Sequence, residues 1–74
     1  MGNKENGVAV EFNHEKLRLF LVGNAKNQRW LAAKLGVSLR TITNMMDGKA
    51  PRVETTERVS KLIGVPVSKL LKVL

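Results

Sequence analysis

A short run of hydrogen-bonding side chains lies between residues 38 and 44, where the chain reads SLRTITN. The run combines one arginine and one asparagine with two threonines and a serine, and it lacks the lysines and glutamates that usually solubilise a surface. Arginine can donate two hydrogen bonds to guanine, and asparagine can pair similarly with adenine, while a leucine or threonine methyl can touch the thymine methyl. These residue types therefore suit contacts with DNA base edges.

Positive charge is concentrated around this run. The 74 residues carry a formal net charge of +7, yet residues 1–25 contain three basic and three acidic residues. Residues 26–52 contain six lysines and arginines and one aspartate. A localised excess of positive charge is typical of a surface that binds a polyanion, whereas a generally basic protein would spread the same charge evenly. The distribution favours a nucleic-acid partner.

Two short helices are predicted at residues 28–35 and 39–46. Each follows a favourable N-cap residue, Asn27 in the first case and Ser38 in the second. Between them, Gly36 can adopt the positive φ that often ends a helix. The hydrogen-bonding run therefore begins at the cap of the second helix.

The packing of these helices predicts a helix-turn-helix at residues 28–46. Ala32 is small enough to let the helices cross closely, and Val37 supplies an apolar residue in the turn. Ile42 and Met45 lie on one side of the second helix and should face the core. The outward side then carries Arg40, Thr43 and Asn44, flanked by Leu39 and Thr41. In such a unit the second helix enters the DNA major groove.

Hydrophobic residues at helical spacing predict three further helices, at about residues 14–23, 54–63 and 66–74. The first should begin after the N-cap residue Asn13. The last should bury an apolar stripe made of Val67, Leu70, Leu71 and Leu74. Five short helices with short connections predict an all-α fold, a compact five-helix bundle that covers residues 13–74 as one DNA-binding domain.

The first 12 residues are expected to lie outside this bundle. Residues 1–7 are polar and rich in glycine and asparagine, which predicts disorder. Val8, Val10 and Phe12 alternate as in a short strand, but no second strand is predicted within the chain. Residues 1–12 are therefore expected to form a flexible arm, or a short strand that pairs with its copy in a dimer.

A longer sequence pattern, which extends across about four-fifths of the chain, resembles that of a known protein family. The segment NQRWLAAKLGVSLRTITNMMDGK, a Pro-containing loop and the segment TERVSKLIGVPVSKLL together make residues 14–71 resemble the Cro/repressor-type, or XRE, helix-turn-helix family. The resemblance implies a five-helix domain of the lambda-repressor-like type and a homodimer on a palindromic operator. It also implies a transcriptional regulator, such as a small phage- or mobile-element-type repressor.

The same resemblance implies two kinds of DNA contact. The residues implied to contact bases are Ser38, Leu39, Arg40, Thr43 and Asn44. The residues implied to contact phosphates are Asn27, Gln28, Thr41, Lys49 and Arg52, and Lys26 is a further phosphate candidate on charge alone. Contacts to the phosphate backbone position a protein on DNA and dominate the salt dependence of binding.

Three features depart from the family pattern, and the first is Lys26 at a position that is usually apolar. The family often carries an arginine late in the first helix and a glutamate at the end of the third, which form an ion pair. Leu21 and Met46 stand at these places, so a hydrophobic contact is expected instead of the ion pair. Thr56 and Glu57 replace two residues that are usually apolar, so the fourth helix is expected to be packed or capped differently.

Other classes of function have weaker support in the sequence. There is no cysteine, and the single histidine, His14, has no acid or thiol arranged beside it, so no enzyme activity, metal site or cofactor is predicted. No apolar run is long enough to span a membrane, and a cytoplasmic, nucleoid-associated protein without a small-molecule ligand is expected. Two alternatives stay open: a protein-binding or antitoxin-like module on the same fold, and membrane-surface binding through the basic, apolar last helix.

Overall fold

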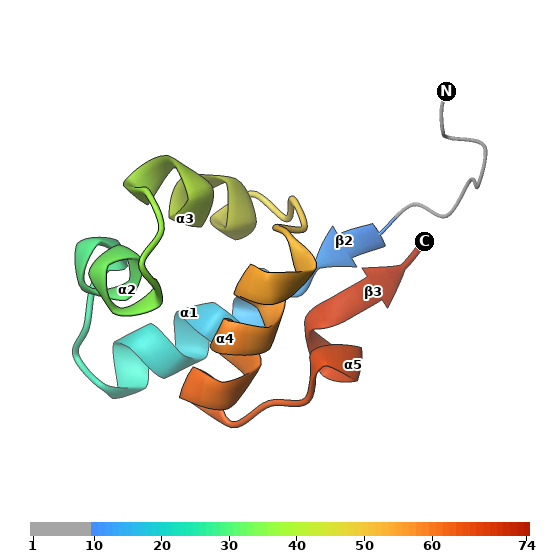
Figure 1. The fold of residues 1–74 in the computed structure, drawn as a ribbon. Helices are drawn as coiled ribbons and strands as arrows, with labels where there is room; N and C mark the ends of the chain where they lie inside the picture. The colour runs from blue at the N-terminus through green and yellow to red at the C-terminus, as the bar shows by residue number, and fades with distance from the viewer. Residues whose placement is uncertain (1–9) are drawn as a thin grey trace.

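The fold was taken from a computed structural model, which describes residues 10–74 (Figure 1). Five helices follow one another in this part of the chain, and two short strands flank them. The helices are α1 (His14–Gly23), α2 (Gln28–Leu35), α3 (Leu39–Met46), α4 (Val53–Ile63) and α5 (Val67–Leu70). The strands are β2 (Val10–Phe12) and β3 (Leu71–Val73). The result is a small, compact, mainly helical domain.

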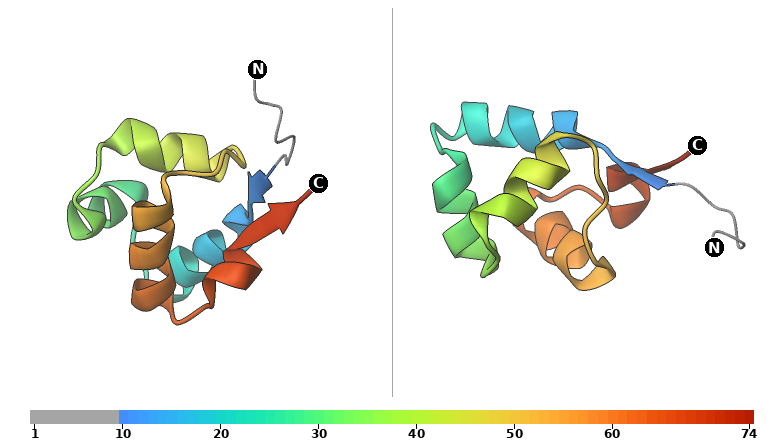
Figure 2. Two further views of the ribbon diagram at one scale, coloured as in Figure 1. Left: turned by 45° about the vertical axis from the view of Figure 1, so that its right-hand side comes forward. Right: turned by 90° about the horizontal axis from the view of Figure 1, so that it is seen from above.

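Helices α2 and α3 have the predicted boundaries, and local hydrogen bonds explain where they begin. The side chain of Asn27 accepts a hydrogen bond from the backbone N–H of Trp30 at 2.9 Å. Ser38 Oγ accepts one from the backbone N–H of Thr41 at 3.2 Å. Gly36 ends α2 with a φ of 70°, where a residue with a Cβ would be strained. Figure 2 shows α3 following α2 through this short turn, so the two form a helix-turn-helix arrangement.

The hydrophobic core is formed by all five helices together with Phe12 of β2. Ile42 and Met45 of α3 are fully buried, as their spacing predicted. The other buried apolar residues of the helices are Leu17, Leu21, Leu31, Ala32, Leu35, Val59 and Leu70. Helix α3 packs against both α1 and α2, and α2 also contacts α4. Because Ile42 and Met45 are held in the core, the opposite side of α3 faces solvent.

The end of the chain corrects the all-α prediction. Helix α5 ends at Leu70, and β3 then pairs antiparallel with β2. The predicted helix to residue 74 is therefore wrong, and Leu74 is 73% exposed rather than part of a buried stripe. Residues 10–12 form a short strand, which is one of the two forms predicted for the N-terminal segment, but its partner is β3 of the same chain rather than a second copy. Residues 1–9, including Val8, lie outside the described part.

Burial of Phe12 explains why the chain end is extended. Phe12 is 1% exposed, and its backbone N–H donates to the carbonyl of Gly48 at 2.8 Å. In the sheet it lies opposite Leu71, which packs against the core. An extended C-terminus satisfies the backbone of β2, whereas a helix continuing to Leu74 would leave that edge without partners.

Helix α1 begins at the predicted residue, but Asn13 does not cap it. Its side chain makes no capping hydrogen bond, and its Nδ2 instead donates to the carbonyl of Lys69 at 3.2 Å. The backbone N–H of Asn13 also donates to the carbonyl of Leu70, at 2.7 Å. Asn13 therefore connects the start of α1 to α5, a contact between residues distant in sequence.

The cap of α2 can be tested by substitution. Asn27→Ala is expected to lower the free energy of unfolding by about 1 kcal/mol, because the N–H of Trp30 loses its acceptor. Urea denaturation followed by circular dichroism would measure this difference. Asn27→Ser keeps a capping oxygen and should lose much less. Equal losses in the two variants would contradict a stabilising role for the cap.

Candidate nucleic-acid interface

The solvent-facing side of α3 carries the residues predicted to contact bases. Arg40 and Thr43 are exposed, Leu39 is 40% exposed and Asn44 is half-buried. Ser38 is exposed at the N-cap, immediately before the first turn. The five predicted residues are therefore at least partly accessible: Arg40 and Thr43 lie away from the buried face of the helix, and Ser38 lies at its N-terminus.

Three hydroxyl groups of this segment already have partners within it. Ser38 Oγ lies 3.1 Å from Thr41 Oγ1 and also accepts the backbone N–H of Thr41. The hydroxyl of Thr43 donates to the carbonyl of Leu39 at 3.1 Å. These hydroxyls stabilise the helix itself, so they can offer a partner their remaining lone pairs, the methyl groups of the threonines, and the one O–H of the Ser38–Thr41 pair that does not donate within it.

Arg40 and Asn44 differ from the hydroxyl residues. Neither side chain forms a hydrogen bond with another residue in the described range 10–74. Arginine offers five N–H donors in a planar fork, and asparagine offers both donors and an acceptor. These two side chains therefore have the most unused hydrogen-bonding capacity on the exposed side of α3.

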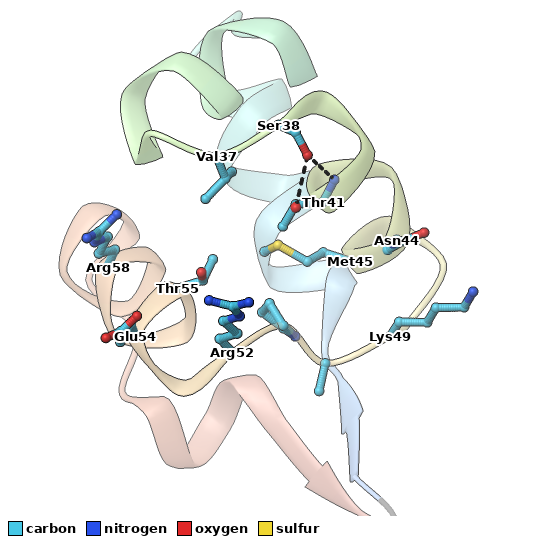
Figure 3. A pocket seen from close by; sticks show the side chains of 12 residues that line it. Val37, Ser38, Thr41, Asn44, Met45, Lys49, Arg52, Glu54, Thr55 and Arg58 are labelled. Carbon is cyan, nitrogen blue, oxygen red and sulfur yellow. Dashed lines mark hydrogen bonds between the residues drawn. The ribbon is translucent and has the colours of Figure 1, made fainter.

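A hollow of about 610 Å³ lies between α3, the loop that follows it and the start of α4 (Figure 3). We call it the α3–α4 hollow. Five of the predicted contact residues line it: Ser38, Thr41, Asn44, Lys49 and Arg52. Arg52 immediately precedes α4, and its side chain points towards α3 in Figure 3. Residues predicted to contact bases and residues predicted to contact phosphates therefore line the same hollow.

Charge around the α3–α4 hollow is predominantly positive. Its lining contains three cationic residues, Lys49, Arg52 and Arg58, and one carboxylate, that of Glu54. The hollow is also next to the first turn of α4, where backbone N–H groups have no partner within the helix. Both features favour a negatively charged ligand.

The other predicted phosphate contacts lie at the start of α2. Lys26, Asn27 and Gln28 line a second hollow, of about 340 Å³, which they share with residues of α1 and with the end of α3. Lys26 Nζ lies 5.2 Å from the centroid of the Trp30 ring, a cation–π contact that holds the ammonium group beside α2. The side-chain oxygen of Asn27 is engaged as the helix cap, which leaves its NH₂ group for an external acceptor.

The residues that differ from the pattern of the resembled family can be located in the structure. Leu21 and Met46 line the same second hollow; Leu21 is buried and Met46 packs against the core. Apolar side chains therefore line one hollow at the two positions where a hydrophobic contact was expected. On α4, Thr56 is 1% exposed and its hydroxyl donates to the carbonyl of Arg52 at 3.2 Å, while Glu57 is exposed. Helix α4 thus buries a threonine whose hydroxyl is satisfied within the helix.

Two residues of α4 that were not among the predicted contact residues complete the α3–α4 hollow. Thr55 lines the hollow and is 8% exposed. Arg58 lines it too, and its Nη1 donates to the carbonyl of Leu35 at 3.0 Å, which joins α4 to the end of α2. Thr55 and Arg58 are three residues apart, a spacing that places two side chains on the same side of a helix, and Val59 follows them. No other feature of the sequence pointed to these two residues.

Neither a metal site nor a membrane span is found in the part of the chain that the structure describes. Residues 10–74 contain no cluster of three or more His, Cys, Asp or Glu residues placed to hold a metal ion. His14, the first residue of α1, is half-buried. Among the described helices, none combines the length and apolar character needed to cross a membrane.

In comparisons with protein-family models, curated proteins and solved structures, the chain has no significant match. Its function is therefore inferred from the geometry and charge of its own residues.

Proposed function

We propose that the protein binds double-stranded DNA in a sequence-specific manner, with α3 in the major groove. The observation that carries this proposal is that the exposed Arg40 and the half-buried Asn44 have hydrogen-bonding groups without a partner in residues 10–74, on a helix anchored in the core by Ile42 and Met45. An α-helix fits the major groove, where arginine and asparagine form bidentate contacts with guanine and adenine.

Groups on the two flanks of α3 support this orientation. Lys26 and Gln28 share a hollow with Met46, near one flank of the helix. Lys49 and Arg52 share the α3–α4 hollow with Thr41, on the other flank. Phosphate contacts on both flanks would hold α3 in the groove and make the affinity fall with increasing salt concentration.

The proposed biological role is that of a small homodimeric transcriptional regulator that acts on chromosomal or phage DNA. A single α3 spans only a few base pairs, which gives limited sequence specificity. Two copies with their α3 helices roughly 34 Å apart would read the two halves of a palindrome on one face of the DNA. A dimer of this type would act as a repressor where its site overlaps a promoter.

In-vitro selection from a random duplex library, near physiological salt, tests the proposal. The expected result is an inverted-repeat consensus with half-site centres about 10 base pairs apart. The matched control is the double variant Arg40→Ala, Asn44→Ala, whose buried residues are unchanged and which should select no consensus. Binding without enrichment by the unmodified protein would contradict sequence-specific reading. Absence of any binding to duplex DNA would contradict the proposal as a whole.

The two alternative functions are a protein-binding module and membrane-surface binding. A protein-binding module on this fold would not require Arg40 or Asn44, so the selection experiment separates it from DNA binding. Membrane-surface binding was expected to use the segment VSKLLKVL as a basic, apolar helix. Only Val67–Leu70 of this segment is helical and Leu70 is fully buried, so we favour DNA binding over this alternative.

A further inference from the structure

The α3–α4 hollow contains a buried hydroxyl group without a partner. Thr55 is 8% exposed, lines the hollow and forms no side-chain hydrogen bond with any other residue in the range 10–74. The neighbouring Thr56 is also buried, but its hydroxyl donates to the carbonyl of Arg52. Because the Thr55 hydroxyl lines the hollow and has no partner within residues 10–74, it can hydrogen-bond to a group that enters the hollow.

The groups around Thr55 are hydrogen-bond donors and cations, so they favour a negatively charged partner. In Figure 3 the guanidinium group of Arg52 lies on the same side of the hollow as Thr55, and both point towards α3. Arg58 is held at the rim by its hydrogen bond to the carbonyl of Leu35, which leaves its other N–H groups available. Helix α4 has 11 residues and no side-chain cap, so the N–H groups of its first turn are open to an acceptor. Hydroxyl, guanidinium and helix N–H donors together suit a phosphate group.

Part of the lining is apolar. Val37, Ala50 and Pro51 contribute apolar surface to the hollow beside its polar groups, and the fully buried Met45 lies behind them. The volume of the hollow, about 610 Å³, is in the range of small-molecule sites. A phosphodiester of a DNA backbone would use the polar groups, but it would leave the apolar part of the hollow without a partner.

We propose that the α3–α4 hollow binds a small phosphate ester. Its phosphate group accepts hydrogen bonds from Thr55 and Arg52, and its organic part contacts Val37 and Pro51. Because Ser38, Thr41 and Asn44 line the same hollow, a bound ester and DNA would exclude one another. This last consequence rests on the proposed DNA binding, whereas ester binding itself does not. A phosphorylated small molecule would then release the protein from its operator.

Titrations of the full-length, ¹⁵N-labelled protein at constant ionic strength test ester binding without DNA. The probes are phenyl phosphate and inorganic phosphate. Phenyl phosphate is expected to give saturable shifts of the Thr55 and Arg52 amide signals, and to bind about tenfold more tightly than inorganic phosphate because its ring buries apolar surface. Absence of saturable shifts would overturn the proposal. Equal affinity for the two probes would overturn it as well, since it would indicate a site for the phosphate group alone.

Substitutions identify the residues that bind. Thr55→Val keeps the side-chain shape, removes the hydroxyl and is expected to weaken phenyl phosphate binding about tenfold. Thr55→Ser should restore most of the affinity. Lys61→Gln removes an exposed charge in the last turn of α4, outside the hollow, and should change affinity less than twofold. The melting temperature of Thr55→Val should not fall, since an unpaired hydroxyl is replaced by a methyl group. Unchanged affinity in folded Thr55→Val would overturn the assignment.

A competition experiment separates this proposal from the proposed DNA binding. Phenyl phosphate is added to the protein bound to its selected duplex, with sodium sulfate at equal ionic strength as the control. Displacement by phenyl phosphate alone supports the shared site. If DNA binds but phenyl phosphate neither binds nor displaces it, the ester site is disproved and DNA binding stands. If phenyl phosphate binds but no duplex does, DNA binding is disproved and the ester site stands.

Discussion

Phe12→Ala is expected to lower the free energy of unfolding by about 3–5 kcal/mol, enough to leave much of the protein unfolded at 37 °C. Phe12 is 1% exposed and is among the largest fully buried side chains. Its removal takes apolar surface out of the core and leaves a cavity between β2 and the helices. A domain of this size has a total stability of about 5–15 kcal/mol, so the expected loss is a large fraction of it.

Val10→Ala provides the matched control for this prediction. Val10 lies on the same strand and the same side as Phe12, but it is 38% exposed and pairs with the exposed Val73. Its substitution should cost less than about 1 kcal/mol, because little buried surface is lost. Chemical denaturation of the two variants, followed by tryptophan fluorescence of Trp30, would measure the difference. Similar midpoints for both variants would contradict the placement of Phe12 in the core.

Arg40→Ala is expected to weaken binding to the selected DNA site about 10- to 100-fold, through the loss of a bidentate base contact. This loss of affinity should occur only with the duplex that carries the selected sequence. Binding to random duplex should weaken only slightly, because a single charge is removed. Fluorescence anisotropy with both duplexes, at a fixed salt concentration, would measure the two affinities. Arg40 is exposed and forms no hydrogen bond within residues 10–74, so folding should be unaffected.

Two further variants distinguish base reading from charge. Arg40→Lys keeps the positive charge but lacks the planar fork, and it should lose nearly as much specificity as Arg40→Ala. Lys61→Ala removes a charge from the far end of α4 and should change neither affinity by more than about twofold, because exposed charges beyond a Debye length of about 8 Å are screened. An equal loss of affinity for the selected and random duplexes in Arg40→Ala would assign Arg40 to the phosphate backbone instead.

The sequence by itself determined the helix-turn-helix arrangement, because its signals are local. The caps at Asn27 and Ser38 lie within three residues of the N–H groups that they accept. Gly36 meets a conformational requirement of its own backbone, and Ile42 and Met45 lie at helical spacing on one face. Each of these features operates within one turn of helix, so residue types and spacing were sufficient to predict α2, α3 and the outward side of α3.

Only the tertiary structure decided the ends of the chain and the second wall of the site. Strand β3 forms because β2, some 60 residues earlier, offers an edge to pair with, and Asn13 bonds to α5 rather than capping α1. The α3–α4 hollow likewise depends on how α4 packs beside α3. Thr55 contributes to this hollow because the packing of α4 buries it there. Arg58 contributes because it donates a hydrogen bond to the carbonyl of Leu35. Spacing along the chain cannot specify such pairings, because many distant partners are compatible with the same local pattern and the packing of the whole core selects among them.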